Sequence, residues 1–160
     1  MKSLFLLFVT IALLITTACS GSRSPEGSAG AATSELAQQE LNKLQGTWKI
    51  ESSVWNGVPE SDAALSVTII FQDDKFIVVD RDGNRQEEKI RLMPDQDPKA
   101  IDCWSKDGGG QASPGIYFLE GDTLTWCSSG GRNRVRPTSF SSNVGSKRSL
   151  LVLRRNQDER

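Results

Sequence analysis

The residues best suited to chemistry in this sequence are two cysteines, Cys103 and Cys127, which each fall in an apolar segment typical of a strand. In an oxidising compartment they could form a disulfide. The segment around Ile116 lies between them, however, and in a meandering sheet it would hold their strands apart. The sequence leaves this bond open. A catalytic thiol is not expected, because the chain has no histidine to activate it.

A second group consists of arginines that alternate along a polar stretch near the C-terminus. Arg132, Arg134 and Arg136 could together bind an anionic ligand such as a phosphate or a glycan. The alternative, which we favour, is a solvated loop in which Arg136 pairs with a nearby carboxylate. If the chain has a functional rim, it would lie in this loop and in the glycine run 108–110.

Aspartates are frequent, but the spacing of Asp95, Asp97 and Asp102 matches no calcium-binding loop, and turn chemistry explains them better. No phosphate-binding glycine loop, nucleophile elbow or metal-binding cysteine pair occurs. We therefore predict no catalytic residue, metal or cofactor, and a protein that is not an enzyme. A net charge of −1 provides no basic field for nucleic acid.

The N-terminus predicts an exported protein. Residues 4–15 are almost entirely apolar, which is the length of a signal-peptide core and too short for a membrane span. The following residues, Thr16-Thr17-Ala18-Cys19, resemble the lipobox of bacterial lipoproteins. The resemblance implies a signal peptide over 1–18 and a lipidated Cys19 that anchors the chain in a membrane. The alternative is an ordinary secretory signal cleaved near Ala18.

The segment after the cysteine predicts a spacer and then a folded domain. Residues 19–32 are rich in Ser, Gly and Ala and indicate a flexible tether. Ser20 resembles the residue found at this position in lipoproteins of the outer membrane, so we expect the protein there, facing the periplasm. The domain is predicted over 33–160, and it opens with a short helix from Thr33 or Ser34 to about Gln45.

From Thr47 onwards, short apolar segments alternate with turn signals such as Asn56-Gly57 and Asp82-Gly83. This pattern predicts a mainly β fold: an antiparallel up-and-down, lipocalin-like β-barrel of about eight strands with a short N-terminal helix. The expected strands are 47–54, 66–71, 75–80, 85–92, 100–105, 116–120, 123–128 and 150–154.

Large aromatic residues recur on the expected inner faces. Trp48 shares a face with Ile50 at the start of the first strand and is predicted to plug one end of the barrel as core packing. If the barrel instead contains a cavity, its lining is expected to come from five aromatic residues, with two arginines at the rim. These candidate ligand-binding residues are Trp48, Phe71, Phe76, Phe118, Trp126, Arg134 and Arg136.

Several stretches together resemble an uncharacterised lipocalin-like bacterial domain family with many members in planctomycetes. They are Leu44-Gln45-Gly46-Thr47-Trp48, Pro98-Lys99-Ala100-Ile101-Asp102, Gly115-Ile116-Tyr117, Gly121-Asp122-Thr123-Leu124 and Arg136-Pro137-Thr138-Ser139-Phe140. The resemblance covers residues 44–155 and implies a small exported barrel, with no activity to carry over. True lipocalins, which share the Gly46-Thr47-Trp48 start, hold small apolar ligands. This shorter domain could equally have a side-chain-filled interior.

Two functions follow from these observations. The first is a membrane-tethered binding module of the cell envelope, whose barrel or rim accepts a small apolar ligand or an envelope component. The second is a structural or protein-interaction lipoprotein with a solid core, which predicts no internal void and an exposed apolar or arginine-bearing patch. An enzyme would require two close carboxylates with perturbed titration in a cleft.

Overall fold

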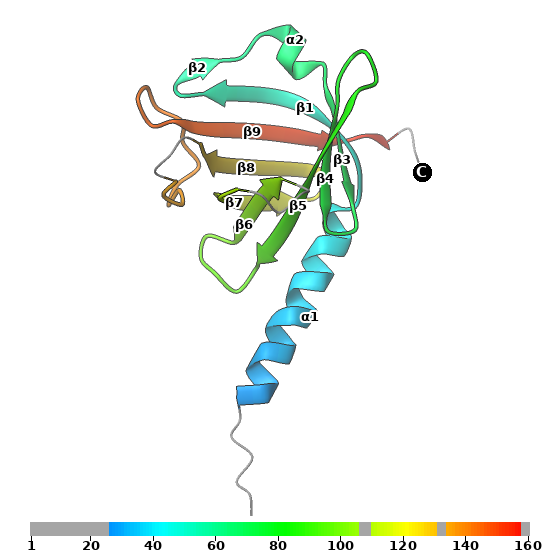
Figure 1. The fold of residues 1–160 in the computed structure, drawn as a ribbon, viewed down its shortest axis with the longest axis vertical. Helices are drawn as coiled ribbons and strands as arrows, with labels where there is room; N and C mark the ends of the chain where they lie inside the picture. The colour runs from blue at the N-terminus through cyan, green and yellow to red at the C-terminus, as the bar shows by residue number, and fades with distance from the viewer. Residues whose placement is uncertain (1–25, 106–109, 131–133, 158–160) are drawn as a thin grey trace, which may run out of the picture.

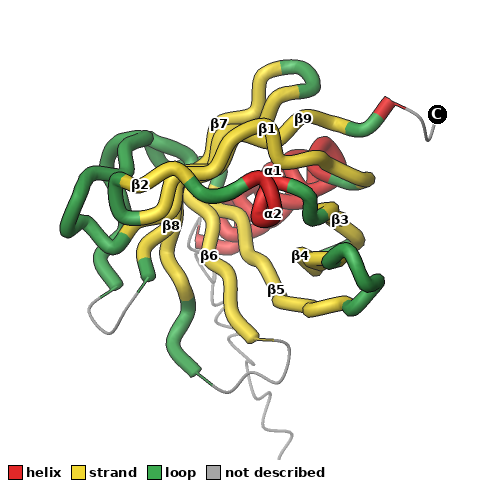
Figure 2. The backbone as a smooth tube through the Cα atoms, turned by 90° about the horizontal axis from the view of Figure 1, so that it is seen from above, coloured by secondary structure: helices red, strands yellow, loops and turns green. Residues whose placement is uncertain are grey.

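Eight strands form a closed antiparallel barrel in the computed structural model of this chain, which describes residues 26–105, 110–130 and 134–157 (Figure 1). Neighbouring strands pair in the order β2-β1-β3-β4-β5-β6-β7-β8-β9, and β1 also pairs with β9, which closes the sheet on itself. Figure 2 shows the strands curling around the barrel when it is seen from above. The elements are α1 (Glu26–Leu44), β1 (Gly46–Trp55), β2 (Val58–Pro59), α2 (Asp62–Leu65), β3 (Thr68–Gln72), β4 (Lys75–Val79), β5 (Arg85–Met93), β6 (Ala100–Ser105), β7 (Ser113–Glu120), β8 (Thr123–Ser129) and β9 (Arg148–Arg155).

The predicted fold class is confirmed, and most predicted strands differ from the observed ones only at their ends. The largest difference is β7, which begins at Ser113 instead of residue 116. Gly115, near the start of β7, faces a bulky neighbour: a Cβ atom at this position would lie 2.7 Å from the Trp126 indole nitrogen. No apolar side chain fits there, so hydrophobic alternation could not reveal the start of this strand.

Helix α1 begins earlier than predicted. It starts at Glu26, so residues 26–32, which were predicted to belong to a flexible tether, are helical. Alanine is frequent in this segment and has the highest intrinsic helix propensity. With 19 residues, the helix is about 28 Å long. Figure 1 shows it projecting away from the barrel, and its side chains at Ser34, Glu35 and Leu36 are exposed.

Trp48 and Arg155 close the barrel at the end where α1 enters. Trp48 is fully buried, and its indole N–H donates to the carbonyl oxygen of Leu44 at 2.9 Å. The Arg155 guanidinium lies over the Trp48 ring, 4.2 Å from its centroid. The same guanidinium donates to the carbonyl oxygens of Gln45 at 2.5 Å and Lys43 at 2.6 Å. These contacts, which we call the latch, satisfy carbonyls that the end of a helix leaves unpaired.

Glu40 fixes the last turns of α1 against the barrel wall. Its carboxylate accepts hydrogen bonds from Lys43 at 2.7 Å, Lys99 at 2.8 Å and the Tyr117 hydroxyl at 3.3 Å. Burial by itself would raise the pKa of Glu40, but the hydrogen bonds and charges of Lys43 and Lys99 outweigh it and hold this pKa below its ordinary value. The ionised carboxylate is therefore the form that docks the helix.

Because of the latch, we expect substitutions of two adjacent arginines to differ strongly in their effect on the free energy of unfolding. Arg155→Met removes the donors to the helix carbonyls, so we expect the free energy of unfolding to fall by about 2 to 4 kcal/mol. Arg154→Met is the matched control, because that side chain is 55% exposed and its ion pair with Glu51 spans 3.4 Å; the expected loss is below about 1 kcal/mol. Urea unfolding followed by tryptophan fluorescence measures both. Equal losses in the two variants would contradict the assignment of the latch.

Glu40 predicts a pH-dependent contribution to stability. Because the pKa of Glu40 is lowered in the folded protein, its contribution is present at neutral pH and is lost as the pH falls through that folded value. Glu40→Gln should therefore be less stable than the wild type at pH 7, and the difference should shrink below about pH 4. Urea unfolding at a series of pH values tests this. Glu120→Gln, an exposed change on β7, controls for the loss of one negative charge. A difference that stays constant with pH would refute the role of the charge.

Candidate functional site

Aromatic rings fill the middle of the barrel. Trp48, Phe71, Phe76 and Trp126 are all buried and lie in ring-to-ring contact. The ring centroids are 6.3 Å apart for Trp48 and Phe71, 5.6 Å for Phe71 and Phe76, and 4.9 Å for Phe76 and Trp126. These are the distances of favourable aromatic pairs in a packed core. The residues predicted to line a cavity therefore occupy the space that a ligand would need.

Phe118 was also predicted to line the interior, and this prediction is wrong. Its side chain is 52% exposed, on the outer face of β7. The reason is strand alternation: Tyr117 is buried in the core cluster opposite Trp126, so the next residue must point outwards. The sequence carried this signal, because Tyr117 and Leu119 alternate with Phe118.

Cys103 and Cys127 are free and lie on opposite faces of the barrel wall, so the disulfide that the sequence left open does not form. Cys103 belongs to the interior cluster, whereas Cys127 lies outside that cluster, with its sulfur 3.6 Å from the carbonyl oxygen of Ser141. β7 also separates their strands. Burial raises the pKa of both thiols, and for Cys103 the neighbouring carboxylate of Glu88 raises it further. Both thiols are therefore protonated and poor nucleophiles.

Arg136 ties the last long loop to the outside of the barrel. Its guanidinium donates to the carboxylate of Asp102 at 2.7 Å and to the carbonyl oxygen of Gly115 at 2.6 Å. Asp102, which is buried, also pairs with Arg91 at 3.1 Å. This is the carboxylate pairing that we favoured from the sequence over an anion-binding site. Arg134 lies elsewhere, at the open end of the barrel, and donates to the carbonyl oxygen of Gln111.

Two hollows lie at opposite ends of the barrel. An open groove of about 650 Å³ borders the latch, between the end of α1, the turn at Gly121 and Arg155. Its charged groups are already engaged: Arg155 with the helix carbonyls and with Asp122, and Lys43 with Glu40. This groove therefore belongs to the closure of the barrel.

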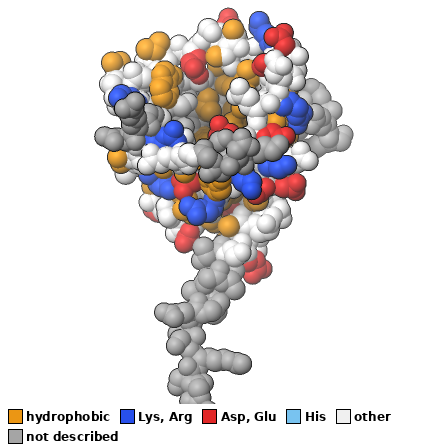
Figure 3. Space-filling view, viewed as in Figure 1, with side chains coloured by type: hydrophobic (Ala, Val, Ile, Leu, Met, Phe, Trp, Pro, Cys, Tyr) orange, Lys and Arg blue, Asp and Glu red, His pale blue; other side chains and the backbone are white. Residues whose placement is uncertain are grey.

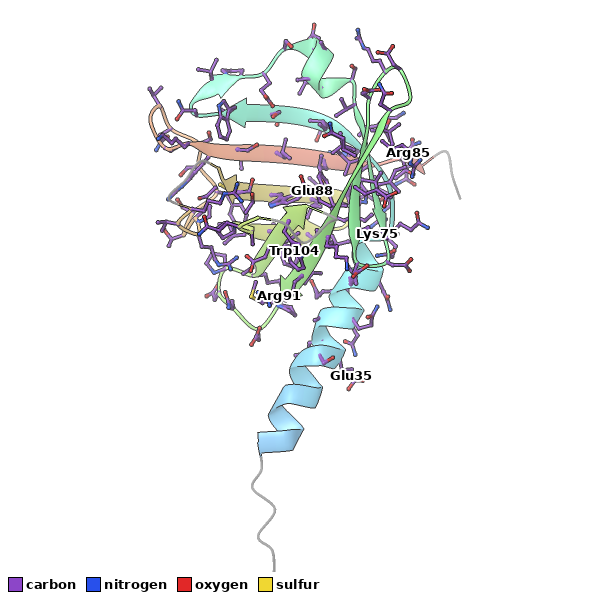
Figure 4. All side chains as sticks on the ribbon, viewed as in Figure 1. Glu35, Lys75, Arg85, Glu88, Arg91 and Trp104 are labelled. Carbon is purple, nitrogen blue, oxygen red and sulfur yellow. The ribbon has the colours of Figure 1, made fainter. Side chains whose placement is uncertain are left out.

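The second hollow, which we call the mouth hollow, has a volume of about 210 Å³ and lies at the open end. Its lining residues are Glu88, Cys103, Trp104, Gly110, Gln111, Ser113 and Arg134. Three neighbouring strands supply Glu88, Cys103 and Ser113, and Figure 4 labels Glu88 on β5 and Trp104 on the adjacent strand β6. The Cys103 thiol donates to the Glu88 carboxylate at 2.6 Å.

Sequence reasoning missed Glu88, although a signal was present. Ile90 and Leu92 are buried in the core cluster, and Glu88 shares their face of β5 by strict alternation. Glu88 also pairs across the sheet with the buried Phe76. A carboxylate on the inner face of a barrel strand is uncommon enough to mark a candidate site.

Three exposed apolar side chains, Trp55, Val58 and Val144, form what we call the apolar rim at the open end. They are 43%, 61% and 83% exposed. Trp55 and Val58 are a cross-strand pair, and the backbone of Gly57 packs so closely on Val144 that a Cβ atom at Gly57 would clash with the Val144 amide nitrogen. Figure 3 shows hydrophobic side chains gathered at the upper left, where Figure 1 places β2.

Hydrogen bonds hold the apolar rim in place. The Asn56 amide donates to the carbonyl oxygen of Arg148 at 2.8 Å, and the Lys147 amide donates to the Asn56 side-chain oxygen at 2.9 Å. The sequence could not predict this rim, because β1 contains an irregularity between Ile50 and Ser52. A bulge of this kind shifts the alternation, so Trp55 shares the face of Trp48 only in the folded strand.

Comparisons with known proteins found no match: no family model, no curated protein and no solved structure corresponds to this chain. Within the described residues, no three histidine, cysteine or acidic side chains come together as a metal site. Neither helix in the described part of the chain combines the length and apolar character of a membrane span. The geometry of the barrel is therefore the basis for any functional assignment.

Proposed function

We propose that this protein is a lipid-anchored, non-enzymatic binding module of the bacterial cell envelope, which binds another envelope protein at the open end of its barrel. The observation that carries this proposal is the difference between the two ends. The latch closes one end and aromatic rings fill the middle, whereas the other end presents the apolar rim beside the mouth hollow. An apolar ligand in the barrel would require these rings to separate, so we place binding at the mouth.

The apolar rim has the properties of a binding surface rather than of a loose loop. Exposed apolar side chains scattered singly are normal, but here three lie together. The hydrogen bonds of Asn56 fix their backbone, so little conformational entropy is lost when a partner binds. Tryptophan is also among the residues enriched where binding energy concentrates. A second protein with an apolar surface is the partner that this chemistry fits.

The N-terminal sequence supports the anchor. Cys19 follows an apolar signal-peptide core, and α1 begins seven residues later at Glu26. A helix of about 28 Å between the anchor and the barrel would hold the apolar rim away from the membrane surface, in the periplasm. The resemblance to a lipocalin-like planctomycete family agrees with this placement and adds no activity.

The anchor predicts a change of location. Cys19→Ala removes the thiol that would be acylated, so the protein should move from the membrane fraction to the soluble fraction, or remain as an unprocessed precursor. Fractionation of cells, followed by mass spectrometry of the N-terminal peptide, measures both. Ser20→Ala is the control and should stay in the membrane fraction. A Cys19→Ala protein that is processed and membrane-bound like the wild type would refute the anchor.

The rim predicts position-specific cross-linking. A photoreactive amino acid at Val58 or Val144 should yield a discrete protein adduct in intact cells, because both side chains are exposed at the rim. The same label at Phe118, exposed on the outer wall, is the matched control and should not yield this adduct. The captured protein is then purified. The Val144→Ser variant of the full chain should bind this protein at least tenfold more weakly than the wild type does. The same adduct at all three positions, or unchanged binding by Val144→Ser, would refute the rim as the binding surface.

A further inference from the structure

Glu88 is a feature of the open end that the rim does not explain. Its carboxylate lies inside the barrel wall, half-buried, next to the aromatic layer formed by Phe76 and Trp126. Within the described residues, its hydrogen-bond partner is the Cys103 thiol, and no lysine or arginine forms an ion pair with it. Taking a carboxylate out of water is costly unless a cation or several donors compensate for it.

The residues around Glu88 indicate what kind of ligand could compensate for the burial of its negative charge. The mouth hollow holds about 210 Å³, which is below the range for drug-sized ligands, so only a small group fits. Ser113, opposite Cys103 on the next strand, adds a hydroxyl that can accept a hydrogen bond. A protonated amine carries three donors on a compact charge and matches a carboxylate with a neighbouring hydroxyl.

We propose that the mouth hollow binds a small protonated amine, with the Glu88 carboxylate as its counter-ion and Ser113 as a further acceptor. The buried thiol of Cys103 holds the carboxylate in position by donating to it, and it takes no part in covalent chemistry. This site is separate from the apolar rim. A metal ion is a poorer fit, because its donors would be one carboxylate and a thiol that stays protonated.

The edge of the hollow limits what the amine can carry. Arg134 lines the same hollow, and its guanidinium is held at the edge by the carbonyl oxygen of Gln111. An amine that also bears an anionic group, such as free phosphoethanolamine or the headgroup of phosphatidylethanolamine, would place its positive end at Glu88 and leave its negative end at the open edge of the hollow. Both of these molecules present the same protonated amine. The experiment below distinguishes the free compound from the lipid headgroup.

The test uses the full lipidated chain in detergent micelles and ligand-observed NMR titrations. The probes are ethylammonium, phosphoethanolamine and inorganic phosphate, with phosphatidylethanolamine vesicles as the lipid source. We expect both amines to bind and Glu88→Gln to weaken them at least tenfold. Glu87→Gln, on the outer face of the same strand, removes the same charge and should leave binding unchanged. Because the lipid anchor inserts into any vesicle, the lipid would be identified as the source only by a loss of vesicle binding in Glu88→Gln that exceeds its loss of binding to free phosphoethanolamine.

Three results would overturn the proposal: no binding of either amine, equal binding by wild type and Glu88→Gln, or binding of phosphate alone. Cys103→Ala keeps the carboxylate and should retain amine binding, so a loss in this folded variant would also count against Glu88 as the determinant. Thermal unfolding of each variant confirms that it is folded. The Glu88→Gln variant is expected to cross-link at the rim as the wild type does. The amine site and the proposed function can therefore fail independently of each other.

Discussion

The structure depends on one arginine placed over one tryptophan. Arg155, the last residue of β9, covers the Trp48 ring and binds the carbonyl groups at the end of α1, while Trp48 itself donates to Leu44. These contacts join the first strand, the last strand and the helix at a single point. A barrel closes only when its first and last strands pair, and that pairing is what the latch holds in register.

The two ends of the barrel differ in the polarity of their inward-facing residues. Near the latch, the interior is apolar and the polar groups are paired within the wall, as in the contacts of Glu40 with Lys99 and Tyr117. Towards the mouth, the inward positions become polar, with Glu88 and Cys103 in place of aliphatic residues. The aromatic layer separates these halves. The proposed binding surfaces therefore both lie at the mouth, where the wall of the barrel holds them in place.

The outer wall has a smaller core of its own. The loop after β8 lies against it: Arg136 binds Asp102, Pro137 is buried, and Cys127 is covered beside Ser141. These residues resemble a charge cluster and a reactive thiol in the sequence, but in the structure they attach the loop. Their role is to fix the rim, because the same loop continues to Val144 and to the backbone contacts of Asn56.

The sequence by itself determined the strands, their antiparallel order and the aromatic core, because alternation of apolar residues and turn signals such as Asp82-Gly83 are local properties. It also contained the inward position of Glu88, which follows from Ile90 and Leu92. Only the tertiary structure decided the rest. The irregularity in β1 shifted Trp55 to the rim, and the pairing of Arg136 required Asp102, which is far away in the chain. These outcomes depend on the exact register of paired strands and on where a long loop lies against the wall, and no local pattern encodes either.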